Sequence, residues 1–78
     1  MRVNFKNIAQ MKKFTKAAEK YDGNVTVSYG TVEVDGESII GLVNIGFNKT
    51  VDVNISDKFS ASAVLFQSEI EQLGIVRE

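Results

Sequence analysis

The spacing of apolar residues changes along this chain, and these changes constrain the fold more than any other feature of the sequence. Apolar and polar residues alternate in four segments, as they do in strands with one buried face. These segments are residues 1–5, 25–29, 32–35 and 51–55. Residues 7–21 and 57–73 instead repeat apolar residues every three to four positions, which is typical of amphipathic helices. Residues 39–45 form a shorter helical segment that is apolar on almost every side.

Turn-forming residues separate these segments and set the order of the elements. Glycine, asparagine and aspartate dominate the breaks, because they tolerate the backbone conformations that tight turns need. The breaks are Asp22-Gly23-Asn24, Gly30-Thr31, Gly36, Gly46 and Gly74. The sequence therefore predicts the order β-α-β-β-α-β-α, with a β-hairpin around Gly30. The apolar positions of the last helix are Phe59, Ala63, Phe66, Ile70 and Leu73.

Each predicted strand has one apolar face, so we expect the strands to form a four-stranded antiparallel sheet. Three helices would cover the apolar face of this sheet and leave its other face in water. The open face would hold polar side chains from all the strands: Arg2, Asn4, Thr26, Ser28, Glu33, Asp35, Asp52 and Asn54. The expected fold class is therefore α/β (α+β), an open-faced β-sandwich. Residues 1–78 are expected to form a single domain, because no linker or repeat divides them.

Composition excludes several classes of protein. The 78 residues include neither cysteine nor histidine, which rules out disulfides, thiolate metal sites and histidine-based catalysis. Hydrophobic residues make up 44% of the chain and charged residues 24%, as is usual for a folded domain. No apolar run reaches the ~20 residues of a membrane span, and the N-terminus has no signal-peptide pattern. We expect a cytoplasmic protein with no cofactor, no metal and no membrane partner.

Two stretches of the sequence resemble the HPr family, the phosphocarrier proteins of the bacterial sugar phosphotransferase system. They are KYDGNVTVSY at residues 20–29 and ESIIGLVNIGFNKTVDVNI at residues 37–55. The second stretch is similar to the family pattern of a serine-led apolar helix, a glycine turn and an alternating strand. The resemblance covers about residues 8–73. It implies an HPr-like open-faced β-sandwich with the element order predicted above.

The resemblance also implies a carrier site, and this chain lacks the residue at its centre. In the family, a histidine at the start of the first long helix carries the phosphate, next to an arginine and a proline. Aligned without a gap, those positions fall on Asn7, Ala9 and Gln10, whereas a second alignment shortens the loop after residues 1–5. Asparagine has no basic nitrogen that can form the phosphoramidate. The chain therefore resembles a degenerate, non-carrier member, similar to the catabolite-repression paralogues of HPr.

Ser38 stands at the position of the family's regulatory serine, immediately before the helix expected at residues 39–45. The resemblance implies that an HPr-type serine kinase phosphorylates it and that a catabolite-control transcription regulator is the partner. The N-terminus of a helix tolerates a phosphate, because its free N–H groups and its dipole favour negative charge. The simpler interpretation is that Ser38 only caps the helix. The family usually has a lysine before this serine, whereas Glu37 stands here.

The helix at residues 39–45 has more apolar residues than one core-facing stripe requires. We expect Leu42 and Ile45 to be buried. The resemblance implies that others form an apolar, partner-binding patch beside Ser38, and exposed apolar patches often mark such sites. The patch residues would be Ile39, Ile40, Val43 and Phe47. The alternative is a helix that is buried on all sides.

Lysines gather on the outward side of the first predicted helix. They are Lys6, Lys12, Lys13, Lys16 and Lys20. This face is either a solvated surface or a contact for an acidic protein or a nucleic acid. The net charge of −1 and the lack of aromatic residues on the open sheet face do not favour direct nucleic-acid binding.

The sequence favours a small regulatory or binding module over an enzyme. Exposed carboxylates such as Glu33, Asp35 and Asp52 are weak catalysts, and the chain has no glycine-rich phosphate loop. The hypothesis is a non-carrier HPr-like protein in carbon catabolite control, with Ser38 and the following helix as its contact surface. One alternative is a self-associating, homodimeric or interaction domain without phosphorylation. A second alternative is a binder of acidic partners or nucleic acid through the lysine-rich helix.

Overall fold

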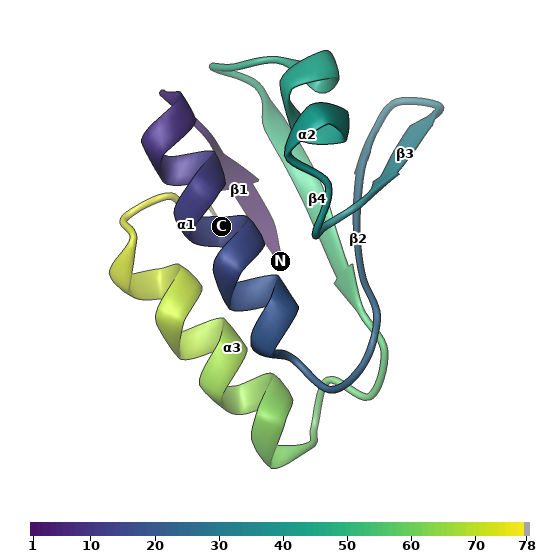
Figure 1. The fold of residues 1–78 in the computed structure, drawn as a ribbon, viewed down its shortest axis with the longest axis vertical. Helices are drawn as coiled ribbons and strands as arrows, with labels where there is room; N and C mark the ends of the chain where they lie inside the picture. Colours follow the sequence, from purple (N-terminus) through teal and green to yellow (C-terminus); the bar gives the residue numbers. More distant parts are fainter. Residues whose placement is uncertain (78) are drawn as a thin grey trace.

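A computed structural model describes residues 1–77, and its elements follow the predicted order (Figure 1). They are β1 (Arg2–Asn4), α1 (Ile8–Lys20), β2 (Val25–Tyr29), β3 (Val32–Asp35), α2 (Ile39–Ile45), β4 (Thr50–Ile55) and α3 (Ala61–Gln72). Across residues 1–77, no helix is both long enough and apolar enough to cross a membrane.

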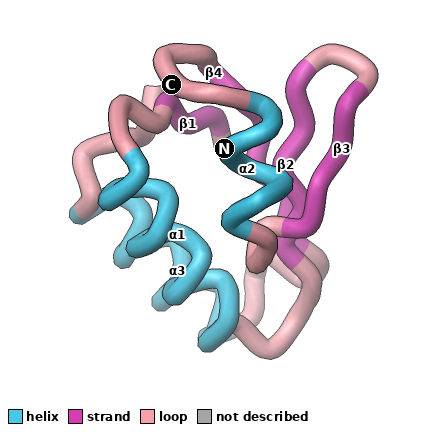
Figure 2. The backbone as a smooth tube through the Cα atoms, turned by 45° about the horizontal axis from the view of Figure 1, so that its top comes forward, coloured by secondary structure: helices cyan, strands magenta, loops and turns pink. Residues whose placement is uncertain are grey.

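The strands form one antiparallel sheet in the order β1-β4-β2-β3, and the helices lie together on one side of it (Figure 2). Residues directly opposite each other on neighbouring strands point to the same face. Asp52 on β4 is opposite both Arg2 on β1 and Ser28 on β2, and Ser28 is opposite Glu33 on β3. This register confirms that the polar residues expected on the open face share one side of the sheet.

A chain of aromatic rings forms the centre of the core, between the sheet and the helices. Phe14 on α1 packs edge-on against Phe5 and Phe66, with ring centroids 5.2 and 5.8 Å away. Tyr21 lies at the other side of Phe66, at 5.7 Å. All of these rings are buried. Because the rings come from the end of β1, from α1 and from α3, they join these elements into one core.

The last helix begins later than the sequence predicts. It starts at Ala61 and not near Asp57, whose φ of 47° lies in the left-handed region and interrupts the helical path. Ser60 then caps the helix, because its Oγ accepts a hydrogen bond from the N–H of Ala63 at 3.0 Å. Phe59 is therefore in the loop before α3 and is 86% exposed, so its assignment to the buried stripe is wrong.

A short C-terminal segment covers the outer edge of β1, a contact that the residue pattern does not predict. Val76 forms a single antiparallel bridge with Val3, and the N–H of Asn4 donates to the carbonyl of Ile75 at 2.8 Å. The Ile75 side chain is fully buried. One edge of the sheet is therefore covered, and β3 forms the other edge.

Candidate protein-contact surface on α2

The ends of α2 are defined by a serine and a glycine. Ser38 Oγ accepts a hydrogen bond from the N–H of Gly41 at 3.1 Å, which is the geometry of an N-cap. Gly46 has a φ of 105°, a conformation that residues with a side chain rarely adopt. Its N–H donates to the carbonyl of Leu42 at 3.0 Å and ends the helix. The sequence alone predicts both ends correctly.

The inner face of α2 packs against the sheet. Leu42 and Ile45 are buried, as the sequence predicts. Gly41 faces β3 so closely that a Cβ built on it would lie 2.9 Å from the Cβ of Val34. The glycine therefore allows the helix axis to approach the hairpin, and this contact determines which side of α2 faces solvent.

Lys49 joins the C-terminal end of α2 to the hairpin. Its Nζ donates to the carbonyl of Ile45 at 2.9 Å and lies 5.1 Å from the centre of the Tyr29 ring. A cation at this end of a helix interacts favourably with the helix dipole, and the ring face adds a cation–π contact. The residue pattern does not mark Lys49 as part of this surface, although a lysine shortly after a helix end is a recognised signal.

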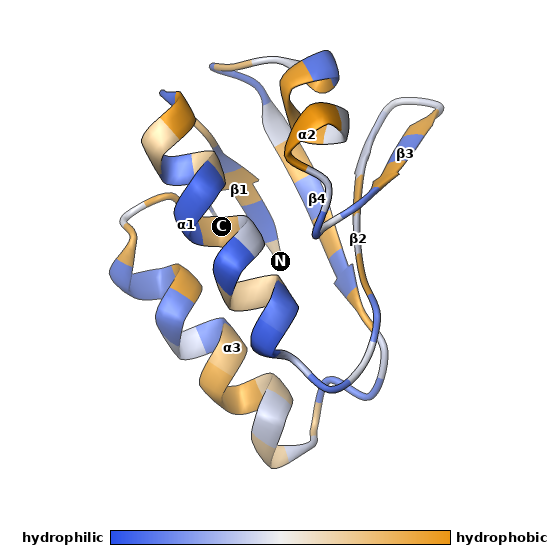
Figure 3. Ribbon diagram, in the orientation of Figure 1, coloured by the Kyte–Doolittle hydropathy of each residue, from blue (hydrophilic) through white to orange (hydrophobic). Residues whose placement is uncertain are grey.

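Most residues of α2 are hydrophobic (Figure 3), and its outer face keeps some of them exposed to solvent. Ile40 is 72% exposed and Val43 is 42% exposed, beside the exposed Asn44. Ile39 and Phe47 are partly buried and pack against the core. The alternative of a helix buried on all sides is therefore wrong, and the exposed part of the expected patch is Ile40 and Val43, which we call the α2 patch.

Ser38 has acidic neighbours in the turn before α2. Its N–H donates to the main-chain carbonyl of Asp35 at 3.0 Å, and the N–H of Glu37 donates to Asp35 Oδ1 at 2.8 Å. Both carboxylates are exposed, whereas Ser38 is partly buried with its Oγ engaged as a cap. A phosphate on Ser38 would gain the helix N-terminus but would be repelled by these carboxylates.

The positions aligned with the carrier site form a helix cap at the start of α1. Asn7 Oδ1 accepts a hydrogen bond from the N–H of Gln10 at 2.9 Å, and Gln10 Oε1 accepts one from the N–H of Lys6 at 2.8 Å. This pair of bonds differs from a capping box by one residue, because Gln10 accepts from the residue before the N-cap and not from the N-cap itself. Ala9 is exposed and contributes no polar group. The side chains at these positions therefore stabilise the helix start.

The start of α1 and the loop after α2 lie at the same end of the molecule (Figure 1). The N–H of Asn48 donates to the carbonyl of Phe5 at 2.8 Å, which holds the loop beside the segment between β1 and the α1 cap. Phe47, partly buried, belongs to this loop. The structure thus brings Phe47 and the segment around Asn7 together, although they are far apart in the sequence.

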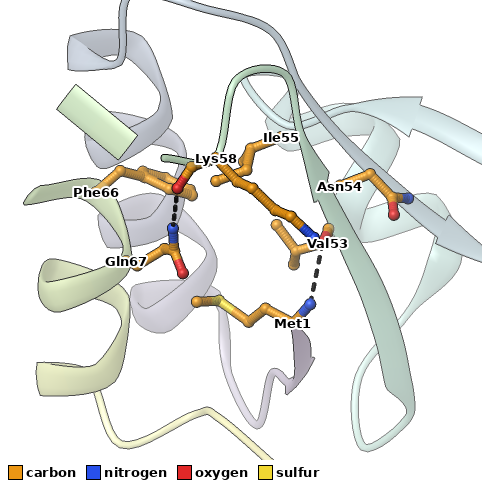
Figure 4. Close-up of a pocket in the computed structure, with 7 residues that line it drawn as sticks. All are labelled: Met1, Val53, Asn54, Ile55, Lys58, Phe66 and Gln67. Atoms are coloured by element: carbon orange, nitrogen blue, oxygen red, sulfur yellow. Dashed lines mark hydrogen bonds between the residues drawn. The ribbon is translucent and has the colours of Figure 1, made fainter. Parts of the chain in front are cut away.

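A cavity of about 190 Å³ lies between β4 and α3 (Figure 4). Its lining residues are Met1, Val53, Asn54, Ile55, Lys58, Phe66 and Gln67. Gln67 Nε2 donates to the carbonyl of Lys58 at 3.2 Å, and the Met1 amino group donates to the carbonyl of Val53 at 3.4 Å. None of the site residues predicted from the sequence lines this cavity. In the part of the chain that the structure describes, acidic residues form no cluster that could hold a metal ion.

Comparisons of the chain with protein-family models, with curated proteins and with solved structures found no match. The structure itself is an α+β domain with a four-stranded antiparallel open sheet and three helices in the described residues. The likeness to HPr therefore rests on the sequence stretches quoted above.

Proposed function

We propose that this chain is a non-carrier, HPr-like binding module that contacts a protein partner through the α2 patch. The observation that carries the proposal is the exposure of Ile40, 72% of whose surface is open to solvent next to Val43. Burying a side chain of this kind in an interface contributes about 1.5–3 kcal/mol. A partner that covers both residues would therefore gain substantial binding free energy from a small surface.

The arrangement of elements supports the HPr-like part of the proposal. The element order and the placement of the helices on one face of the sheet agree with what the resemblance implies. Ser38 caps α2 and Asn7 caps α1. The resemblance implies the family's regulatory serine at Ser38 and, in the ungapped alignment, its carrier histidine at Asn7. With asparagine at the carrier position, the proposed role includes no phosphate transfer and no catalytic step.

The partner that the resemblance implies is a catabolite-control transcription regulator. Its binding to the purified chain is measured by isothermal titration calorimetry with wild type, Ile40→Asp and the matched control Ser68→Asp, which adds the same charge at an exposed position of α3. We expect Ile40→Asp to weaken binding at least about tenfold and Ser68→Asp to change it less than about twofold. Equal effects of the two variants would contradict the α2 patch, and no binding by wild type would contradict this partner.

The role of Ser38 needs a separate measurement. The chain is incubated with ATP and an HPr-type serine kinase and analysed by mass spectrometry, with Ser38→Ala as the control. Modification confined to Ser38 would support regulation by phosphorylation at the start of α2. No modification, under conditions that fully modify an HPr protein, would leave Ser38 as a helix cap only. The carboxylates of Asp35 and Glu37 oppose a phosphate at this position.

Self-association through the same patch is the competing use of this surface. Sedimentation of wild type and Ile40→Asp over a range of concentrations distinguishes self-association from binding to a different protein. A dimer that forms in wild type and is lost in Ile40→Asp would favour a homodimer, whereas a monomer in both favours a different partner.

A further inference from the structure

A second surface, separate from the α2 patch, lies between α1 and α3. The two helices lie side by side and run in opposite directions (Figures 1 and 2). Two hollows, of about 340 and 170 Å³, follow the seam between them. Both hollows are lined by Ala17, Lys20 and Glu69, so they are adjacent parts of one seam. We call it the α1–α3 groove.

The α1 wall of the groove is basic. Lys13, Lys16 and Lys20 line it, and all are exposed. Lys20 Nζ makes an ion pair across the groove with Glu69 at 3.0 Å, between two solvent-exposed side chains. Such an exposed pair contributes little to stability, so an incoming carboxylate can replace Glu69 at small cost. The wall therefore favours a ligand with negative charge.

The α3 wall and the floor of the groove combine apolar and polar side chains. Leu65 lines the groove and is 67% exposed, and the other lining residues on this side are Ala17, Ser62, Phe66, Glu69, Gln72 and Leu73. Figure 3 shows hydrophobic segments in the first half of α3, and hydrophilic segments along α1 and in the second half of α3. Val64 is also exposed but does not line the groove. A ligand that fills the groove therefore needs apolar side chains as well as negative charge.

We propose that the α1–α3 groove binds an acidic, amphipathic segment of a partner protein. Its carboxylates would face Lys13 and Lys16, and its apolar side chains would contact Leu65. The groove is concave, which suits a helix or an extended peptide better than a flat lipid surface. At about 1.5 Å per residue, the 12 residues of α3 offer roughly 18 Å, the length of about three helical turns.

A second copy of this chain fits the groove less well than such a segment. Three of the exposed carboxylates, Glu33, Asp35 and Asp52, lie on the open face of the sheet, and the others in the described residues are dispersed over α1, α3 and the turns: Glu19, Asp22, Glu37, Asp57 and Glu71. The open face is broad and cannot enter a seam between two helices. The occupant is therefore a protruding segment of a different protein. The proposal does not rest on the α2 patch, because none of the residues that line the α1–α3 groove belongs to α2.

The test is a selection of phage-displayed random peptides of about 14 residues against the purified chain. We expect the enriched peptides to combine aspartate or glutamate with apolar residues, and their affinity to fall as salt concentration rises. In ¹⁵N spectra, the amide signals of Ala17, Ser62 and Leu65 should shift on binding. No enrichment, or enriched peptides without acidic residues, would overturn the proposal.

Two matched pairs of variants then locate the binding site. The double variant Lys13→Glu, Lys16→Glu is compared with Lys6→Glu, Lys12→Glu, which makes the same change of net charge outside the groove. We expect at least about a tenfold loss of affinity in the first and less than about a twofold loss in the second. Leu65→Ser should weaken binding, whereas Val64→Ser should not. Equal effects within either pair would overturn the assignment to the groove.

Two further measurements separate this surface from its competitors. Ile40→Asp should leave peptide binding unchanged, and a loss of binding in that variant would overturn the proposal in favour of the α2 patch. Sedimentation with phosphatidylserine vesicles tests a membrane surface. Vesicle binding that Leu65→Ser abolishes, without any peptide binding, would overturn the proposal in favour of lipid.

Discussion

At the scale of single residues, the three helices of the described chain begin in the same way. In each, an oxygen of the capping side chain accepts a hydrogen bond from the N–H three residues later. The pairs are Asn7–Gln10, Ser38–Gly41 and Ser60–Ala63, at 2.9, 3.1 and 3.0 Å. The cap at Ser38 is predictable, because Gly36 breaks the chain just before it. The cap at Ser60 is not, because Ser56 and Asp57 are equally good capping residues.

The cap at Ser38 can be tested apart from any phosphorylation. Ser38→Ala is expected to lower the free energy of unfolding by about 1 kcal/mol, because the N–H of Gly41 loses its acceptor. Ser38→Asp should be nearly neutral, since aspartate caps as well as serine. Urea denaturation of the three proteins measures the difference. A loss in Ser38→Asp as large as in Ser38→Ala would mean that repulsion from Asp35 and Glu37 cancels the stabilisation by the cap.

Gly41 provides a second test, in which two effects have opposite signs. Alanine would raise helix propensity by about 1 kcal/mol. Its Cβ, however, would lie 2.9 Å from the Cβ of Val34, an atom fixed to the β3 backbone. We expect the clash to prevail and Gly41→Ala to destabilise the domain by about 1–3 kcal/mol. Asn44→Ala, on the exposed side of the same helix, should be neutral or slightly stabilising. Stability changes of the same sign in Gly41→Ala and Asn44→Ala would contradict this packing.

At the scale of elements, the residue pattern predicts the strands and their faces better than it predicts their edges. Alternation over Val51–Ile55 is enough to place β4 and to predict which of its faces is buried. The C-terminal segment that pairs with β1 shows no alternating pattern in the sequence, because a single bridge at Val76 is too short for alternation to be seen. The start of α3 is missed for a related reason: Phe59 fits the apolar spacing, but the conformation of Asp57 removes it from the helix.

The cover on β1 should be needed for stability. Ile75→Ala removes a fully buried side chain and is expected to cost about 2–5 kcal/mol. The Asn4 amide, which donates to the carbonyl of Ile75, should exchange its hydrogen faster in this variant. Val76→Ala, at a partly buried position, serves as the control and should cost less. Unchanged stability and exchange in Ile75→Ala would mean that the edge of β1 is stable without its cover.

At the scale of the whole molecule, the sequence predicts the element order and most of the core, but not the surfaces that stay open. Phe66 and Leu65 are neighbours in α3, and periodicity correctly places Phe66 in the core. Nothing in the sequence shows that Leu65 borders a groove, because the groove exists only once α1 lies beside α3. The α2 patch is predicted more closely, since its helix has apolar residues on more sides than the core can cover.

The ring cluster makes the stability of the whole domain sensitive to one residue. Phe14→Ala should cost about 3–5 kcal/mol. At about 0.05–0.15 kcal/mol per residue, a chain of 78 residues has roughly 4–12 kcal/mol in total. We expect this variant to lose much of its folded population on warming, as measured by circular dichroism. Phe59→Ala, the same change at an exposed position, should shift stability by less than about 0.5 kcal/mol. Similar melting curves for the two variants would contradict the core described here.

The lysines of α1 and the carboxylates of the open sheet face lie on opposite sides of the sheet. The net charge is only −1, so the molecule is nearly neutral as a whole, while α1 and the open sheet face differ in local charge. At low salt it should be retained by both cation- and anion-exchange resins, in opposite orientations. The same asymmetry would turn the molecule during a diffusional encounter, so that an anionic surface meets α1 first and a cationic surface meets the sheet first.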